Sequence, residues 1–171
     1  HGSPTEANAH PQTDSDRVVA VVHNGILENY TSLRAELIDA GVALQSDTDT
    51  ELIAQLLGRE QGDLEQRVLR VLPRLKGQFA VVAVSRVEPD LVVAFRQGPP
   101  LVVGLGDGES IVASDVTALL HRTRRVIFLE NGDVAVVRRR QATILGGDGE
   151  PVERTVHRLD WDAGRVEKGG F

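Results

Sequence analysis

Asn24 and Gly25 are the residues of this chain whose types and spacing point most directly to chemistry. They follow an apolar run, 18–22, and His23. The side chain of Asn24 offers an NH₂ donor, and Gly25 offers a backbone N–H that no Cβ shields. Two donors aimed at one point can stabilise the oxyanion of an acyl-transfer transition state. Taken alone, an Asn-Gly pair is more typical of a tight turn than of an oxyanion hole.

A second polar cluster, Ser-Asp-Thr-Asp-Thr-Glu at 46–51, lies about one helix further along the chain. Side-chain oxygens of this kind commonly begin a helix by accepting a backbone N–H. Either Thr48 or Asp49 can take this role. If Thr48 is the cap, the carboxylate of Asp49 is left for another task.

Other residue patterns in the sequence are weaker evidence for a functional site. His10 and His23 lack a carboxylate at metal-ligand spacing, so we interpret both as structural hydrogen-bonding residues. The glycines within 104–108 lack the helix that follows a dinucleotide loop, and we interpret them as a strand end and a turn. Ser114 has no histidine at a hydrolase spacing. The sequence therefore predicts neither a metal nor a cofactor.

Composition excludes several functional classes. The 171 residues suffice for one domain with a core, and a net charge of −6 disfavours a nucleic-acid surface. Two local basic clusters, Arg122 with 124–125 and the run 138–140, are interpreted as solvated turns and strand ends rather than a phosphate patch. No apolar run reaches the length of a membrane span, and no secretory signal is recognisable, so we expect a cytoplasmic protein that contacts no membrane.

Hydrophobic periodicity predicts helices first and strands afterwards. The β-branched run 17–23 is typical of a strand buried on both faces. Helices are expected at 28–40, from Thr48 or Asp49 onward, and at 63–75. Strands are then expected at 78–85, 91–96, 101–105, 110–113, 126–129, 133–138 and 141–145, with turns at 89–90, 107–108 and 131–132 and a short helix at 116–121. Such segregation predicts a layered α+β architecture.

Several motifs in a fixed order resemble one family, and together they cover almost the whole chain. They are His1-Gly2-x-Pro4, Asn8-Ala9-His10-Pro11, Val22-His23-Asn24-Gly25-Ile26, the 46–51 cluster, Gly98-x-Pro100-Leu101, Ala113-Ser114-Asp115, 128–133 and the segment 160–171. This set resembles the glutaminase domain of the glutamine–fructose-6-phosphate aminotransferases, a family of class II glutamine amidotransferases. The resemblance implies an N-terminal-nucleophile (Ntn) hydrolase fold, a four-layer αββα sandwich, here lacking its first strands.

The resemblance also implies a reaction. In this family an N-terminal cysteine attacks the side-chain amide of glutamine, with its own α-amine as the general base. The released ammonia passes to a sugar-phosphate isomerase module, which converts fructose 6-phosphate to glucosamine 6-phosphate. Residues 1–159 are then a partial amidotransferase domain, and 160–171 lead toward the isomerase module. The family further implies a homodimer.

Roles transfer only where residues match. Asn24 and Gly25 resemble the oxyanion hole, and Asp49 resembles the carboxylate that holds the α-ammonium of glutamine, a pairing that charge favours. His1 matches a histidine of the loop that holds the α-carboxylate.

The chain contains no cysteine and no methionine. We therefore expect a fragment that lacks its nucleophile and is inactive alone. Two alternatives stay open at this point. One is another class II amidotransferase, of the amidophosphoribosyltransferase or asparagine-synthetase type, and the other is a degenerate module that binds glutamine without catalysis.

Overall fold

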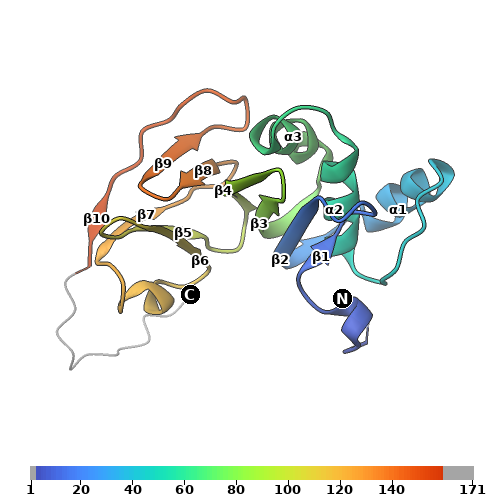
Figure 1. Ribbon diagram of the computed structural model, residues 1–171, viewed down its shortest axis with the longest axis horizontal. Coiled ribbons are helices and arrows are strands. Elements are labelled where there is room, and N and C mark those ends of the chain that lie inside the picture. The colour runs from blue at the N-terminus through green and yellow to red at the C-terminus, as the bar shows by residue number, and fades with distance from the viewer. Residues whose placement is uncertain (1–2, 160–171) are drawn as a thin grey trace.

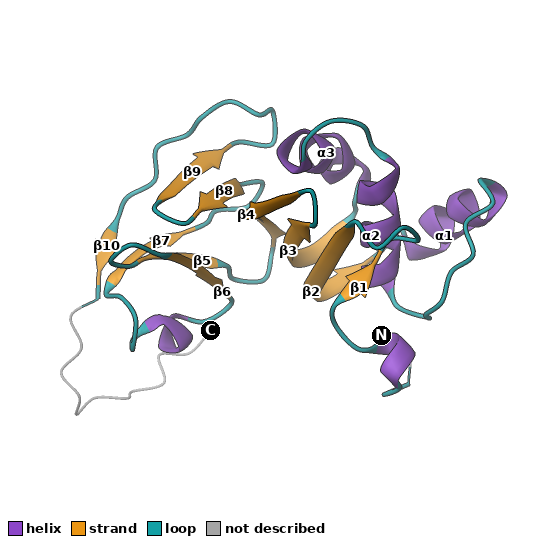
Figure 2. Ribbon diagram, viewed as in Figure 1, coloured by secondary structure: helices purple, strands orange, loops and turns teal. Residues whose placement is uncertain are grey.

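Two antiparallel sheets pack against each other, and the helices lie on the far side of the larger sheet, the second and third against it and the first against the second (Figure 1). The computed structural model describes residues 3–159. His1 and the segment 160–171, to which the sequence assigns a substrate contact and a linker, lie outside the described residues. Helices and strands are segregated along the chain as predicted (Figure 2).

The larger sheet has six strands, in the order β1-β2-β3-β4-β8-β9. Each neighbouring pair is antiparallel. The strands are β1 (Gln12–Thr13), β2 (Val19–Leu27), β3 (Gly77–Ser85), β4 (Glu88–Gln97), β8 (Val134–Arg138) and β9 (Gln141–Leu145).

The smaller sheet has four strands, in the order β10-β7-β5-β6, and is also antiparallel. Its strands are β5 (Val102–Leu105), β6 (Ser110–Ala113), β7 (Arg125–Phe128) and β10 (His157–Arg158). The two-residue strands β1 and β10 carry no periodicity of their own and were not predicted.

The helices are α1 (Tyr30–Asp39), α2 (Asp49–Arg59) and α3 (Leu64–Val71), with short 3₁₀ helices η1 (Glu6–Asn8), η2 (Leu72–Arg74) and η3 (Val116–Leu119). Helix α2 is the central one, because every residue from 49 to 57 is buried. No helix among residues 3–159 has the length and apolar character needed to cross a membrane.

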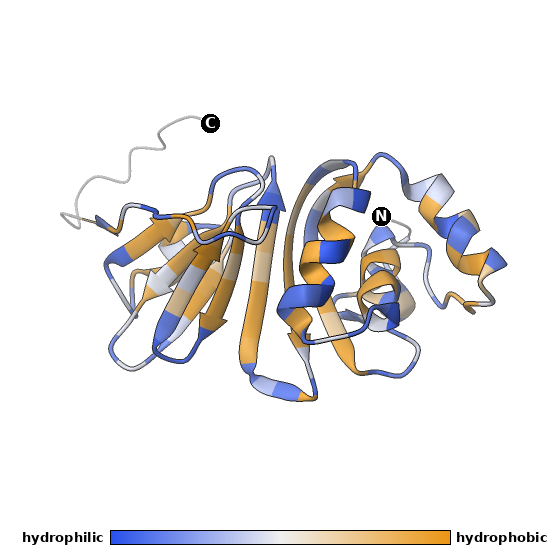
Figure 3. Cartoon of the chain, turned by 90° about the horizontal axis from the view of Figure 1, so that it is seen from above, coloured by the Kyte–Doolittle hydropathy of each residue, from blue (hydrophilic) through white to orange (hydrophobic). Residues whose placement is uncertain are grey.

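Three groups of apolar side chains hold the layers together. The largest lies between the helices and the six-stranded sheet. A second joins the two sheets through small residues of the larger sheet, Ala80, Ala94 and Ala135. The third packs η3 against the outer face of the four-stranded sheet. Figure 3 shows hydrophobic residues along the central strands and hydrophilic ones at the loops. Within the described residues, η3 is the outermost layer, where the αββα pattern has helices.

The predicted strand 17–23 differs from the structure in two ways. β2 does not end at His23 but continues through Gly25 to Leu27, paired throughout with β3. It is also buried on one face only, since Val22 and Ile26 are 40% and 62% exposed. The four-stranded sheet lies over β4, β8 and β9 (Figure 1), and the outward face of β2 projects beyond it.

Two predicted turns have other roles. Asn131 and Gly132 do turn the chain, but β7 and β8 on either side belong to different sheets, so the segment is a crossover rather than a hairpin. Pro89 and Asp90 lie inside β4 at an irregularity in its pairing with β3. Proline donates no ladder hydrogen bond and is tolerated at such bulges.

Candidate active site

Gly25 lies within a paired strand, which excludes the tight-turn interpretation of the Asn-Gly pair. It is directly opposite Phe79 of β3 and has a φ of 121°. A Cβ at this position would lie 2.0 Å from the carbonyl oxygen of Gln78 and 2.9 Å from the Cα of Phe79. Only glycine therefore allows β3 to approach this point of β2.

The Asn24 side chain is exposed on the opposite face of the strand from His23, together with Val22 and Ile26. Within residues 3–159, its side-chain amide forms no hydrogen bond to another residue. An amide in this position retains both of its N–H donors for a ligand.

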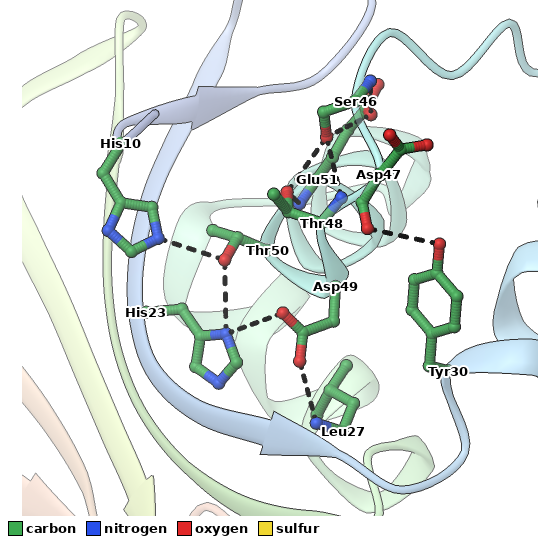
Figure 4. A network of polar contacts seen from close by, with 10 residues as sticks. All are labelled: His10, His23, Leu27, Tyr30, Ser46, Asp47, Thr48, Asp49, Thr50 and Glu51. Atoms are coloured by element: carbon green, nitrogen blue, oxygen red, sulfur yellow. Dashed lines mark hydrogen bonds and ion pairs between the residues drawn. The ribbon is translucent and has the colours of Figure 1, made fainter. Parts of the chain in front are cut away.

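Asp49 is the first residue of α2 but does not cap it. Thr48 is the cap, because its Oγ1 accepts the backbone N–H of Glu51 at 3.3 Å. One carboxylate oxygen of Asp49, Oδ2, instead accepts the N–H of Leu27 at 2.9 Å. The other, Oδ1, lies 3.5 Å from Nδ1 of His23 (Figure 4). The carboxylate thus joins the start of α2 to the end of the strand that carries Asn24.

The pKa of Asp49 is set by opposing effects. Burial alone would raise the pKa, but hydrogen bonds from His23 and from the Leu27 N–H outweigh it and hold the pKa below its ordinary value. Asp49 is therefore a carboxylate at neutral pH, able to attract an ammonium group.

Two histidines share one hydroxyl group near this carboxylate. Oγ1 of Thr50 lies 3.1 Å from Nε2 of His10 and 3.3 Å from Nδ1 of His23 (Figure 4). Burial and the charge of His23 lower the pKa of His10, and nearby Asp49 partly opposes this. Both histidines are thus hydrogen-bonded within the fold, as interpreted from the sequence. In the part of the chain that the structure describes, no group of three or more His, Cys, Asp or Glu side chains gathers as a metal site.

Glu51 fixes the loop that enters α2. Its side chain is buried and accepts the backbone N–H groups of Gln45 and Ser46, at 2.8 and 2.7 Å. The hydroxyl of Ser46 also donates to it at 2.8 Å. The sequence does not reveal this role of Glu51, nor the bridging role of Thr50, because both depend on contacts that helix capping patterns do not encode.

The structure thus brings Asp49 to the C-terminal part of β2, a few residues beyond Asn24 and Gly25. It places two donors on the strand and one anchored carboxylate at the adjoining helix. This combination suits a substrate with an ammonium group at one end and an acyl group at the other.

Comparisons with known proteins agree on one family. The sequence signature described as "Glutamine amidotransferase domain" matches residues 3–121. Curated relatives called glutamine–fructose-6-phosphate aminotransferase [isomerizing] are 48% identical in Symbiobacterium thermophilum, 47% in Thermotoga maritima and 47% in Streptomyces coelicolor. Each match covers 100% of this chain but only 28% of the relative, so the chain spans little more than a quarter of their length.

Solved structures show the same fold at lower identity. Glutamine phosphoribosylpyrophosphate amidotransferase from Bacillus subtilis, complexed with ADP and GMP, has a TM-score of 0.73 at 23% identity and covers 86% of this chain and 33% of its own. A structure described as the allosteric regulatory enzyme of purine biosynthesis gives 0.72, also at 23% identity, and covers 85% and 32%. These likenesses confirm the Ntn-type α+β fold.

Proposed function

Because the chain belongs to the glutamine amidotransferase domain family, we propose that it forms the glutamine-binding and oxyanion-stabilising part of a glutaminase. Asp49 pairs with the α-ammonium of glutamine. The side-chain N–H of Asn24 and the backbone N–H of Gly25 donate to the amide oxygen as it becomes an oxyanion. The observation that carries this proposal is the hydrogen bond from Leu27 to Asp49, which fixes a carboxylate beside the strand of the donor pair.

The chemistry requires a nucleophile that these 171 residues do not supply, since they include no cysteine. We propose that a thiol from outside this sequence attacks Cδ of the glutamine amide. Collapse of the oxyanion breaks the C–N bond and releases ammonia, and water then hydrolyses the thioester to glutamate. The role of this chain is to orient the substrate before that attack and to stabilise the negative charge that the attack creates on the amide oxygen.

We further propose fructose 6-phosphate as the acceptor of the ammonia. Relatives named for this reaction are 45–48% identical over the whole chain. In this proposal residues 1–159 are the amidotransferase unit, and 160–171 lead to a sugar-phosphate isomerase module that forms glucosamine 6-phosphate. A homodimer, which rests on the family resemblance alone, and a cytoplasmic location are further expectations.

The second candidate is a phosphoribosylpyrophosphate amidotransferase. Its support is the shared fold, at only 23% identity. The coding sequence on either side of these 171 codons distinguishes the candidates. A cysteine codon upstream and a sugar-isomerase module downstream support the first, and a phosphoribosyltransferase module downstream supports the second. If no cysteine is encoded, a non-catalytic glutamine-binding module replaces both.

A hybrid enzyme tests the site itself. This chain would replace the matched 172 residues of the Symbiobacterium relative, so that the relative supplies the rest of the enzyme. We expect the hybrid to release glutamate from glutamine. A hybrid that folds and still binds fructose 6-phosphate but hydrolyses no glutamine would contradict the proposal.

A further inference from the structure

The fold brings together two arginine clusters that lie apart in the sequence. Arg122 and the pair 124–125 lead into β7, and the run 138–140 lies at the turn between β8 and β9. Both approach the 106–109 turn, since Arg122 pairs with Glu109 and Nε of Arg139 donates to the carbonyl of Gly108 at 3.3 Å. Positive charge is thus concentrated at one place in a chain whose net charge is −6.

A pocket of about 390 Å³ opens at this place. It is lined by the segment 105–107, Thr123 and three arginines, Arg124, Arg125 and Arg158. Its volume falls within the range of about 300–1,000 Å³ for small-molecule sites. Its lining includes residues of β5, β7 and β10. These strands of the four-stranded sheet lie on the other side of the molecule from β2 and α2 (Figure 1).

Two of these arginines are placed against each other by strand pairing. Arg125 of β7 and Arg158 of β10 are direct cross-strand partners, so their side chains leave the sheet on the same face. Like charges in this arrangement destabilise a sheet. No carboxylate within residues 3–159 forms an ion pair with either of them or with Arg124. The repulsion is therefore not relieved inside the described fold.

The backbone around these arginines is fixed. Oγ1 of Thr123 donates to the carbonyl of Leu105 at 2.6 Å and accepts the N–H of Arg125 at 3.0 Å. The N–H of Leu159 donates to the carbonyl of Arg124 at 2.8 Å. These hydrogen bonds hold the backbone from which the arginine side chains extend, so less of the site has to become ordered when a ligand binds.

The nearby acids only partly offset the positive charge. Glu109 is occupied by Arg122, which donates to both of its oxygens at 2.8 and 2.7 Å. Asp107 is the one carboxylate among the lining residues. Three arginines and one acid therefore line the pocket, a balance of charge that matches a ligand carrying two or more negative charges.

We propose that this pocket binds a small molecule bearing a phosphate or diphosphate group, with Arg125 and Arg158 as its principal contacts. The planar guanidinium fork matches phosphate oxygens two at a time. The concave shape favours a small molecule over an extended acidic partner. The proposal does not depend on the glutaminase function, because no residue of the pocket belongs to the Asn24–Asp49 site.

Calorimetric titration of the 171-residue chain at constant ionic strength tests this, with inorganic phosphate and pyrophosphate as separate probes. We expect saturable binding, and at least tenfold weaker binding in Arg125→Ala and in Arg158→Ala. Arg86→Ala is the matched control, since Arg86 is also exposed and lies on another turn. Tighter binding of pyrophosphate than of phosphate would identify a diphosphate ligand, and equal binding a single phosphate group.

Thermal unfolding separates a binding role from a structural one. Without phosphate, Arg158→Ala should unfold at a temperature no lower than the wild type, because the change relieves repulsion. With pyrophosphate, the wild type and the control should gain more stability than Arg158→Ala. The proposal is wrong if chloride reproduces the effect, if the control loses binding equally, or if Arg158→Ala is destabilised without phosphate. Binding of a polyglutamate peptide but not of pyrophosphate would likewise overturn it in favour of an acidic protein partner.

Discussion

The carboxylate of Asp49 accepts the backbone N–H of Leu27 at 2.9 Å, and this bond ties the first turn of α2 to the end of β2. Asn24 and Gly25 lie on the same strand, three and two residues before Leu27 respectively. The position of the proposed ammonium-binding group is therefore coupled to the position of the proposed oxyanion donors. The arrangement explains why a carboxylate so well buried is retained where Thr48 already caps the helix.

Asp49→Asn should weaken both stability and glutamine binding. The amide still accepts a hydrogen bond from Leu27 but loses its charge, and a charge-assisted bond contributes roughly 1–2 kcal/mol more than a neutral one. Denaturant unfolding of the chain measures the first effect, and KM for glutamine in the hybrid enzyme measures the second, with an expected rise of about tenfold or more. Asp39→Asn, on the exposed end of α1, should change neither. An unchanged KM would make Asp49 a purely structural residue.

Gly25→Ala should destabilise the fold strongly. The new Cβ meets the Gln78 carbonyl at 2.0 Å and the backbone has a φ of 121°, so strain and overlap combine. Gly41→Ala is the matched control, because Gly41 has a φ of 80° but nothing within 4 Å of an added Cβ. We expect about 1 kcal/mol for the control, from backbone strain alone, and at least about 2 kcal/mol more for Gly25. Equal losses in denaturant unfolding would show that β3 does not constrain this position.

Thr50→Val should measure how much the shared hydroxyl contributes to the stability of the fold. Valine keeps the shape of threonine but removes the group that His10 and His23 both contact. Because the site is buried, the loss should be about 1–3 kcal/mol in the free energy of unfolding. Thr50→Ser retains the hydroxyl and should recover most of this difference. A valine variant as stable as the serine variant would mean that the hydroxyl does not bind the two rings.

Acid should destabilise the chain partly through His10. Its pKa is lowered in the fold from an ordinary value of 6.5, chiefly by burial. Just below pH 6.5 the unfolded chain therefore binds more protons at this residue than the folded one, so stability falls as the pH drops through that window. His10→Gln should show a shallower decline between about pH 7 and pH 5. His121→Gln, an exposed control, should follow the wild type. Parallel curves for all three proteins would contradict this account.

Local patterns in the sequence were sufficient for most elements. The sequence restricts the cap of α2 to Thr48 or Asp49 and predicts strands such as β6 and β9, because caps and alternation are local properties. The likeness to solved amidotransferases confirms the fold class that the motifs implied.

Non-local pairing could not be predicted in the same way. Asn24 and Gly25 look like a turn in the sequence, but Gly25 is required by the backbone of Gln78, which lies far along the chain. The turn at Asn131 likewise gives no sign that β7 and β8 enter different sheets. The pairing of Arg125 with Arg158 depends on a two-residue strand that no periodicity marks.

The most direct test of the proposed site is the effect of Asn24→Ala on glutamine hydrolysis by the hybrid enzyme. Because Asn24 is exposed and holds no other part of the described fold, the variant should remain folded. We expect kcat to fall by about 10²-fold or more, with little change in KM, as for loss of one oxyanion donor. Gln141→Ala, at the exposed start of β9, serves as the control and should leave kcat unchanged. A folded Asn24→Ala enzyme with unaltered turnover would contradict the assignment of the oxyanion hole.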